Sequence, residues 1–315
     1  MPDQAPERVL LTGGRGFVGA RLHRALSRAE PGWEVHAAGG PHDDDLPLDV
    51  TDAAAVADLV QRLRPTAVVH LAAVSAVTAA NENPRGAWDV NLGGALNLTD
   101  ALTRHAPECR LLHVSSAEVY GRSFAPGEAL DETALLQPTN PYAASKAAAD
   151  ILVRQCAASG LTAVVARPFN HIGAGQAEAF VVPAFAGQVA RIEAGLQPPE
   201  IRVGALDDQR DFLDVDDVVD AYLRLLRLRG PAEPGAVYNI ASGRSVRIGD
   251  ILDALLRLSS AAITVTVDPA RLRPGGTSTA RGDARRLAAD TGWSAFTPLE
   301  VSLRSILDHE RRRIG

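Results

Sequence analysis

A tyrosine and a lysine lie four residues apart at the start of an alanine-rich run, in the segment NPYAASK (140–146). The run predicts a helix to about Ser159, which puts Tyr142 and Lys146 on one face, about one turn apart. A phenol with a pKa of about 10 is a poor acid at neutral pH, but a neighbouring cation favours the phenolate and lowers that pKa. Such a pair can move a proton to or from an oxygen on a carbon that exchanges hydride. The same spacing also occurs on solvated helix faces, so the rest of the chain must decide.

The composition of the 315 residues, 46% hydrophobic and 22% charged, is that of a globular protein with one large or two modest domains. A net charge of -6 argues against a nucleic-acid partner. Cys109 and Cys156 have no metal-ligand or redox spacing, so we expect free thiols, no metal and a reducing cytoplasm. No apolar run reaches the roughly 18 residues of a membrane span, and residues 1–8 do not resemble a signal peptide. We therefore expect a cytoplasmic protein with no membrane partner.

A glycine-rich turn follows the first apolar run of the sequence. Residues 9–12 predict a strand, residues 20–29 predict a helix, and glycines stand at 13, 16 and 19 between them. Glycines at these positions let the chain turn tightly, approach a pyrophosphate and pack the helix against the strand, while the helix N-terminus favours the anion. The context predicts a dinucleotide-binding turn. Its candidate cofactor contacts are Gly13, Arg15, Gly16, Phe17 and Val18.

The second strand, expected at 34–38, ends without the carboxylate that NAD sites usually offer to the ribose. The chain reads Gly39-Gly40-Pro41 there, and Arg15 could meet the additional phosphate of NADP. These features favour NADP(H). Three aspartates at 43–45 follow closely, so NAD(H) stays open as the cofactor.

Further cofactor contacts are expected at the ends of the next elements. A short third strand at 46–49 would put Asp49 and Val50 beside the adenine, although Asp49 could equally cap the helix expected at 52–63. A fourth strand at 67–70 runs into small residues that leave space for a cofactor. The candidates here are Leu71, Ala72 and Ala73, together with Asn91 in a helix expected at 88–105.

A fifth strand, expected at 110–115, is followed by Ser116. Ligands of open parallel sheets are met at the carboxyl ends of the strands. Ser116, Tyr142 and Lys146 are therefore expected to converge.

Four motifs occur in order: TGGRGFVG (12–19), HLAA (70–73), VSSAEVYG (114–121) and NPYAASK (140–146). In this order and spacing the chain resembles the extended short-chain dehydrogenase/reductase family of nucleotide-sugar enzymes. The resemblance implies an α/β fold, with a doubly wound parallel Rossmann sheet and a smaller C-terminal α/β domain. The Rossmann domain would span 1–168 with a returning segment near 211–241, and the sugar-nucleotide domain 169–315. The resemblance also implies that Tyr142 is the acid–base catalyst and that Ser116 hydrogen-bonds the substrate oxygen. Lys146 would lower the pKa of Tyr142 and hold the nicotinamide ribose.

The segments FVVP (180–183), IEAG (192–195), IRVG (201–204) and RDFLD (210–214) resemble the branch of this family that reduces GDP-4-keto-6-deoxy-mannose. The substrate contacts that we expect are Asn170, Val181, Arg202, Arg210 and Arg273. A guanidinium pairs with phosphate oxygens bidentately, so Arg210 is expected on the diphosphate, with a salt bridge to Asp211 or Asp214 as the alternative. Relatives continue Arg273 and its proline into an acidic residue, where this chain has glycines, so that loop departs from the pattern.

The leading hypothesis is therefore an NAD(P)H-dependent reduction of the C4 ketone of a GDP-linked 4-keto-6-deoxy-hexose. Glu118 stands where 4,6-dehydratases keep the base that takes the C5 proton, which makes a dehydratase the alternative; Ala117 replaces the acid that many dehydratases have beside it. A 4-epimerase and a non-catalytic dinucleotide sensor are further readings. The resemblance also implies a homodimer in which helices near 88–105 and 142–159 form a four-helix bundle.

Overall fold

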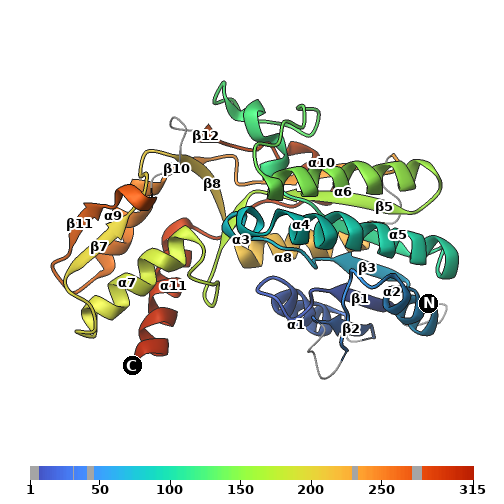
Figure 1. Cartoon of the computed structure of the whole chain (residues 1–315), viewed down its shortest axis with the longest axis horizontal. Coiled ribbons are helices and arrows are strands. Elements are labelled where there is room, and N and C mark those ends of the chain that lie inside the picture. Colours follow the sequence, from blue (N-terminus) through green and yellow to red (C-terminus); the bar gives the residue numbers. More distant parts are fainter. Residues whose placement is uncertain (1–6, 31, 41–45, 229–232, 272–278) are drawn as a thin grey trace.

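The first lobe of the molecule is built on a sheet of six parallel strands in the order β2-β1-β3-β4-β5-β9 (Figure 1). The computed structural model describes residues 7–30, 32–40, 46–228, 233–271 and 279–315. The strands are β1 (Arg8–Thr12), β2 (Glu34–Ala38), β3 (Ala67–His70), β4 (Arg110–Val114), β5 (Ala163–Pro168) and β9 (Val237–Ile240). Their central members are buried on both faces, as expected for parallel strands that are covered by helices on both sides.

Helices cover both faces of this sheet and bury a hydrophobic core on each. The first core includes residues of α1 (Gly19–Ala29), α8 (Val215–Arg227) and α10 (Arg285–Thr291). The second includes residues of α2 (Ala53–Leu63), α5 (Gly94–His105) and α6 (Pro141–Ala158). The expectation of a doubly wound parallel sheet is confirmed, and the segment around β9 returns to it as the sequence indicated.

A second, smaller lobe lies at the left of Figure 1 and contains the C-terminus. Its strands form a sheet in the order β10-β8-β12, with β6 also on β8, and a separate β11-β7 pair. Their bounds are β6 (Asn170–Ile172), β7 (Glu200–Val203), β8 (Gln209–Asp214), β10 (Ser245–Arg247), β11 (Thr264–Val267) and β12 (Thr279–Ala280). Three helices pack their apolar faces into this lobe's own core: α7 (Val181–Glu193), α9 (Ile248–Leu258) and α11 (Leu299–Ile314). Short turns of 3-10 helix are η2 (Ala117–Phe124) and η3 (Pro269–Arg271).

The strand expected at 46–49 is wrong. This segment makes an isolated bridge between Gly39 and Pro47 and no ladder. A proline has no N–H to donate to a ladder, which is why the apolar run around it does not continue as a strand.

The helix expected at 88–105 starts earlier and is interrupted. After α3 (Val77–Glu82), α4 (Pro84–Trp88) begins with Asn83 as its N-cap and passes into a five-residue π-helical turn, η1 (Asp89–Gly93), before α5. Single π-turns within α-helices are frequent at functional sites. Among the described residues, no helix is both long and apolar enough to cross a membrane.

Candidate active site

Tyr142 lies in the first turn of α6. The side chain of Asn140 caps this helix by accepting a hydrogen bond from the backbone N–H of Ala143 at 2.8 Å, and Pro141 occupies the first helical position, which needs no donor. The segment NPY therefore fixes where the helix begins. This places Tyr142 at the N-terminal end of α6 and Lys146 one turn later, as the spacing predicts.

Tyr142 is half-buried, and the burial of its phenol raises its pKa to about 12. A side-chain hydrogen bond with Ser116 acts against this rise, and the charge of Glu118 reinforces it. Ser116 and Glu118 therefore both lie close to the phenol of Tyr142. The spacing suggested that Lys146 lowers the pKa of Tyr142. In this structure Lys146 is not among the groups that shift that pKa, and its ammonium binds the carbonyl of Val114 instead.

Lys146 is 4% exposed, and its ammonium donates a hydrogen bond to the backbone carbonyl of Val114, the last residue of β4. Burial lowers the pKa of Lys146 to about 8, and the carboxylate of Asp150, one turn further along α6, opposes that shift. The lysine therefore connects the helix to the carboxyl end of a central strand, close to Ser116.

Ser116 follows β4 and caps η2, its Oγ accepting a hydrogen bond from the backbone N–H of Glu118 at 3.2 Å. The neighbouring Ser115 has a buried Oγ with no hydrogen-bond partner. Of the two serines it is Ser116 that interacts with Tyr142.

Asn91 lies in the π-turn and is completely enclosed. Its amide contacts the backbone of Val74 at 2.8 and 3.3 Å and donates to the hydroxyl of Ser145 at 2.9 Å. Ser145 in turn donates to the carbonyl of Tyr142. Asn91 thus fixes the segment after β3 and the first turn of α6. The sequence analysis missed Ser145, although it lies within the motif.

The glycine-rich turn fits a bound dinucleotide. A Cβ added at Gly13 or Gly19 would lie within 3 Å of neighbouring backbone atoms, whereas at Gly16 the one close atom is a backbone oxygen at 3.2 Å. Gly13 and Gly19 are needed for packing, and Gly16 leaves room for a ligand. The N-terminus of α1 has no side-chain cap and no acidic residue in its first turn, so its dipole favours an anion there.

The remaining candidate cofactor residues are distributed around this turn. Leu71 and Ala72 follow β3 and hydrogen-bond through their N–H groups to Thr12, at 3.0 and 3.5 Å, and Ala73 follows them. Asp49 does not end a strand; its Oδ1 accepts hydrogen bonds from the N–H and hydroxyl of Thr51, which lower its pKa, while Asp52 caps α2. Val50 is buried.

Phe17 connects the glycine-rich turn to the second lobe. Its ring stacks on His171 at 6.4 Å, and the guanidinium of Arg21 lies 4.4 Å above its centroid. Arg21 also donates to the carbonyl of Ala174. The loop after β6 therefore lies beside the cofactor candidates of the first lobe.

Beneath Lys146 lies a buried network that the sequence analysis did not identify. Arg167, on β5, binds both oxygens of Asp150 at 2.8 and 3.0 Å, with the two side chains 1% and 0% exposed. Arg167 also donates to the hydroxyl of Tyr120, which donates to Asn239 at 2.7 Å. The available signal was an acidic residue four positions after Lys146, on the same helical face.

Among the substrate candidates, Asn170 is exposed on β6, and Val181 opens α7. Arg210, on β8, donates to the carbonyl of Gln209 and lies 3.4 Å from Asp208, so its acidic neighbour is not one of the two expected. Asp211 instead accepts hydrogen bonds from Ser242, Gly243 and Gly282. Arg273 lies outside the described residues.

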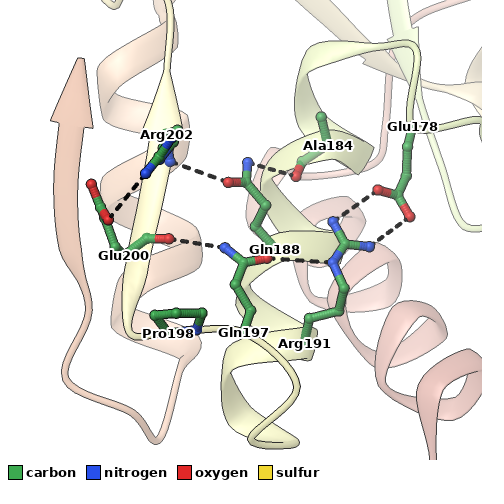
Figure 2. A pocket seen from close by; sticks show the side chains of 8 residues that line it. All are labelled: Glu178, Ala184, Gln188, Arg191, Gln197, Pro198, Glu200 and Arg202. Carbon is green, nitrogen blue, oxygen red and sulfur yellow. Dashed lines mark hydrogen bonds and ion pairs between the residues drawn. The ribbon is translucent and has the colours of Figure 1, made fainter. Parts of the chain in front are cut away.

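Arg202 lines a cavity of about 450 Å³ between α7 and β7 (Figure 2). Gln188 donates to the carbonyl of Ala184 and accepts from the backbone N–H of Arg202 at 3.1 Å. Arg191 holds both oxygens of Glu178 at 3.0 Å. The cavity is thus walled by polar groups that are partly exposed and mutually paired.

Comparisons with known proteins place this architecture in a family. The model of the "NAD dependent epimerase/dehydratase family" matches residues 9–241. The chain is 38% identical over 309 residues to a GDP-6-deoxy-D-mannose reductase of Pseudomonas aeruginosa, covering 98% of each protein.

Two solved structures are similar over nearly their whole length. RMD from Pseudomonas aeruginosa complexed with NADPH has a TM-score of 0.87 and 37% identity, covering 98% of this chain and 99% of that one. A Thermus thermophilus UDP-glucose 4-epimerase in complex with NAD has a TM-score of 0.83 and 29% identity, covering 96% and 99%. With the parallel sheet, the glycine-rich turn and the buried tyrosine–lysine pair, the chain belongs to the NAD dependent epimerase/dehydratase family.

Proposed function

We propose that this protein is an oxidoreductase that reduces the C4 ketone of a GDP-linked 4-keto-6-deoxy-hexose, with NADPH as the hydride donor and NADH as the alternative. The observation that carries the proposal is the likeness over 98% of both chains to a GDP-6-deoxy-D-mannose reductase. A chain that retained the fold alone would not need Ser116, Tyr142 and Lys146 together in one buried place.

Ser116, Tyr142 and Lys146 are each assigned a separate role in the reduction. A nicotinamide cofactor bound here would supply hydride to C4, and negative charge would then develop on the substrate oxygen. The hydroxyl of Ser116 bonds that oxygen, and Tyr142 donates the proton to it. A phenol with a pKa of about 12 remains protonated in the resting chain, as a proton donor must. Lys146, charged beside this pocket, stabilises the phenolate that forms and holds the nicotinamide ribose.

The cofactor would lie along the first lobe, 1–168 with the returning segment near 211–241. Its pyrophosphate is assigned to Gly13, Gly16, Phe17 and Val18, its adenine to Asp49 and Val50, and its remaining contacts to Arg15, Leu71, Ala72, Ala73 and Asn91. The sugar nucleotide is assigned to the second lobe, within 169–315, apart from α8, β9 and α10, which pack in the first lobe. There Asn170 and Arg210 would hold the sugar diphosphate, Val181 and Arg202 would lie against the nucleoside, and Arg273 would add a phosphate contact.

Cofactor stoichiometry tests the function. Purified protein should oxidise one NADPH for each GDP-4-keto-6-deoxy-mannose consumed, followed by nicotinamide absorbance and product chromatography. Consumption of GDP-mannose itself with no net change in nicotinamide absorbance would replace the reductase by a 4,6-dehydratase.

One observation favours that second candidate. The carboxylate of Glu118 lies close enough to Tyr142 to raise its pKa, so a base is present in the same pocket. Ala117, which is apolar, lies beside Glu118 and cannot act as the acid for the leaving hydroxyl. We therefore assign Glu118 to a sugar hydroxyl in the reductase.

The protein is also proposed to be a cytoplasmic homodimer. Leu96 on α5 and Ile151 on α6 are 52% and 56% exposed, although both are large apolar residues on neighbouring helices. A second copy packed on these helices as a four-helix bundle would cover them. Ile151→Glu should convert the dimer to a monomer in light scattering, whereas Leu135→Glu, at an exposed position outside these helices, should not; a wild-type monomer at micromolar concentration would contradict the assignment.

The unpaired thiols of Cys109 and Cys156 fit a reducing compartment.

A further inference from the structure

Lys146 is the only lysine of the whole chain, in which 31 other cationic side chains are arginines. Arginine stays charged in any protein environment, whereas the lysine ammonium changes its pKa readily when buried. At position 146 the protonation state of the side chain can therefore depend on its surroundings. What surrounds that charge decides its state.

Polar residues lie in lateral register on three neighbouring parallel strands, at the strand ends where Lys146 contacts the sheet. Thr12 of β1 pairs with His70 of β3, and His70 pairs with His113 of β4. The Thr12 hydroxyl lies 2.7 Å from His70 Nδ1, and the two imidazoles stack with centroids 5.5 Å apart and planes at 30°. All three side chains are buried. The ammonium of Lys146 donates to the carbonyl of Val114, which directly follows His113.

Buried polar atoms in this row have no hydrogen-bond partner: His70 Nε2 and both ring nitrogens of His113. An unpartnered buried polar group costs about 1–3 kcal/mol, and apolar rings of the same shape would avoid that cost. The imidazoles are therefore not explained by packing. The ammonium of Lys146 reaches the backbone carbonyl next to His113, and its charge acts on both rings.

Burial and the charge of Lys146 determine the protonation states of His70 and His113. Burial and then the ammonium of Lys146 lower the pKa of His70 to about 3, and the pKa of His113 lies well below its ordinary value for the same reasons, with His70 adding to the effect. Both rings stay neutral and can turn a lone pair toward a cation. On its own helix Lys146 faces Asp150, whose two oxygens are both held by Arg167, and Tyr142, whose phenol is protonated.

We propose that His113 is a positioning residue for Lys146: its neutral imidazole, held in place by the ring of His70 and the hydroxyl of Thr12, replaces water around the buried ammonium and keeps it charged. Asp150 is shared with Arg167, so the histidine row supplies solvation that the carboxylate alone does not. The inference rests on the proposed function only for the role of Lys146 in turnover. The charge of Lys146 itself can be measured without turnover.

Because the chain has one lysine, protein labelled with 13C at the lysine ε-carbon gives a single lysine signal, whose shift follows the protonation of Lys146. This signal and the pH profile of kcat are measured for wild type, His113→Phe and His113→Gln. Phenylalanine keeps the aromatic shape without the nitrogens, and we expect the titration midpoint and the alkaline limb of kcat to fall together by about one pH unit, a tenfold change in proton affinity. Glutamine keeps neutral polar atoms and should hold both within a few tenths of a unit.

His36→Phe is the matched control, since His36 lies on β2 of the same sheet, also has an unpartnered buried Nε2, and is separated from β3 by β1. It should leave the midpoint unchanged. An unchanged midpoint in His113→Phe, or an equal fall in His36→Phe, overturns the proposal. If His113→Phe does not fold, Thr12→Val, which releases His70, should lower the midpoint by a smaller amount, and an unchanged midpoint there overturns it too. A midpoint that falls in a protein with no reductase activity supports this inference while the proposed function fails.

Discussion

The two lobes differ in how far they bury a bidentate pair of charged side chains. In the first lobe, Arg167 and Asp150 form a bidentate pair that is 1% and 0% exposed, directly below Lys146. In the second lobe, Arg191 and Glu178 form a pair of similar geometry that is 32% and 36% exposed at the cavity of Figure 2.

The difference is informative about the two tasks. A buried pair cannot exchange its partner for water, so it fixes the position of whatever is attached to it and shifts the pKa of its neighbours. A half-exposed pair exchanges partners at little cost. The first arrangement suits a proton donor and its cation, which must stay where hydride arrives. The second suits a surface that closes around a charged nucleotide sugar.

The largest effect is expected when the proposed proton donor of the first lobe is removed while its surroundings are kept. Tyr142→Phe removes the proposed proton donor and should lower kcat by about a hundred- to ten-thousandfold, the usual contribution of general acid catalysis. Binding of NADPH, followed by fluorescence, should be preserved. Tyr222→Phe is the control, because the buried hydroxyl of Tyr222 has no hydrogen-bond partner and its removal should leave kcat near wild type. Near-normal turnover in Tyr142→Phe would end the catalytic assignment.

The second prediction compares the two ion pairs directly. Arg167→Met leaves the carboxylate of Asp150 buried without a partner and should cost about 3–5 kcal/mol of unfolding free energy. Arg191→Met breaks the half-exposed pair and should cost at most about 1 kcal/mol. Urea denaturation of both variants measures the two values. Equal losses would mean that the lobes do not differ in the way described.

The third prediction concerns acid. The pKa of His70 is about 3 in the folded chain, whereas an unburied histidine has a pKa of about 6.5. Between these values the unfolded chain binds a proton that the folded chain does not bind. Stability should therefore fall as the pH drops from about 6.5 toward 3, at up to about 1.4 kcal/mol per pH unit for this group.

Glu193 of the second lobe, which is paired with Arg311, responds at lower pH. The hydrogen bond of Arg311 holds the pKa of Glu193 at about 2, so its contribution is full above 4.5 and is lost only as the pH falls through about 2. Urea denaturation against pH for wild type and His70→Asn measures the difference. The variant should lose part of the slope between pH 6.5 and 3, and a slope identical to that of wild type would show that His70 protonates normally in the fold.

The smallest effect is expected at the cavity. Arg202→Ala removes one partly exposed cation from the proposed nucleoside site and should raise KM for the GDP-sugar by about tenfold with kcat nearly unchanged, as for a lost hydrogen bond to a charged group. Arg257→Ala, on the exposed face of α9, is the control. A fall in kcat with an unchanged KM would move Arg202 from binding to chemistry.

Much of the architecture follows from local pattern. The apolar runs at 34–38 and 67–70 are strands with the predicted bounds. These segments have regular periodicity between clear breaks, and the fold agrees with it. The run at 46–49 failed because its proline prevents a ladder whatever its hydropathy, and the start of α4 was missed because Asn83 and Pro84, an N-cap and first-turn pair, were not recognised.

Candidate site residues divide in the same way. Tyr142 and Lys146 are predictable because their relation is four residues along one helix. Ser116 is predictable from its place after a strand of a parallel sheet. Asp150 lies four residues after Lys146 on one helix, but its pairing with Arg167 of β5 has no local signal. The contact of Ser145 with Asn91 has none either.

By itself, therefore, the sequence determined the order of strands and helices, the glycine-rich turn and the spacing of a tyrosine from the only lysine in the chain. The tertiary structure decided the chemical state of that lysine and tyrosine. Lys146 donates to Val114 and lies above two neutral histidines, and burial raises rather than lowers the pKa of Tyr142 in the chain alone. A pKa depends on the solvent that is excluded and on the charges that lie nearby, and strands β1, β3 and β4 bring those groups together only when the sheet has formed.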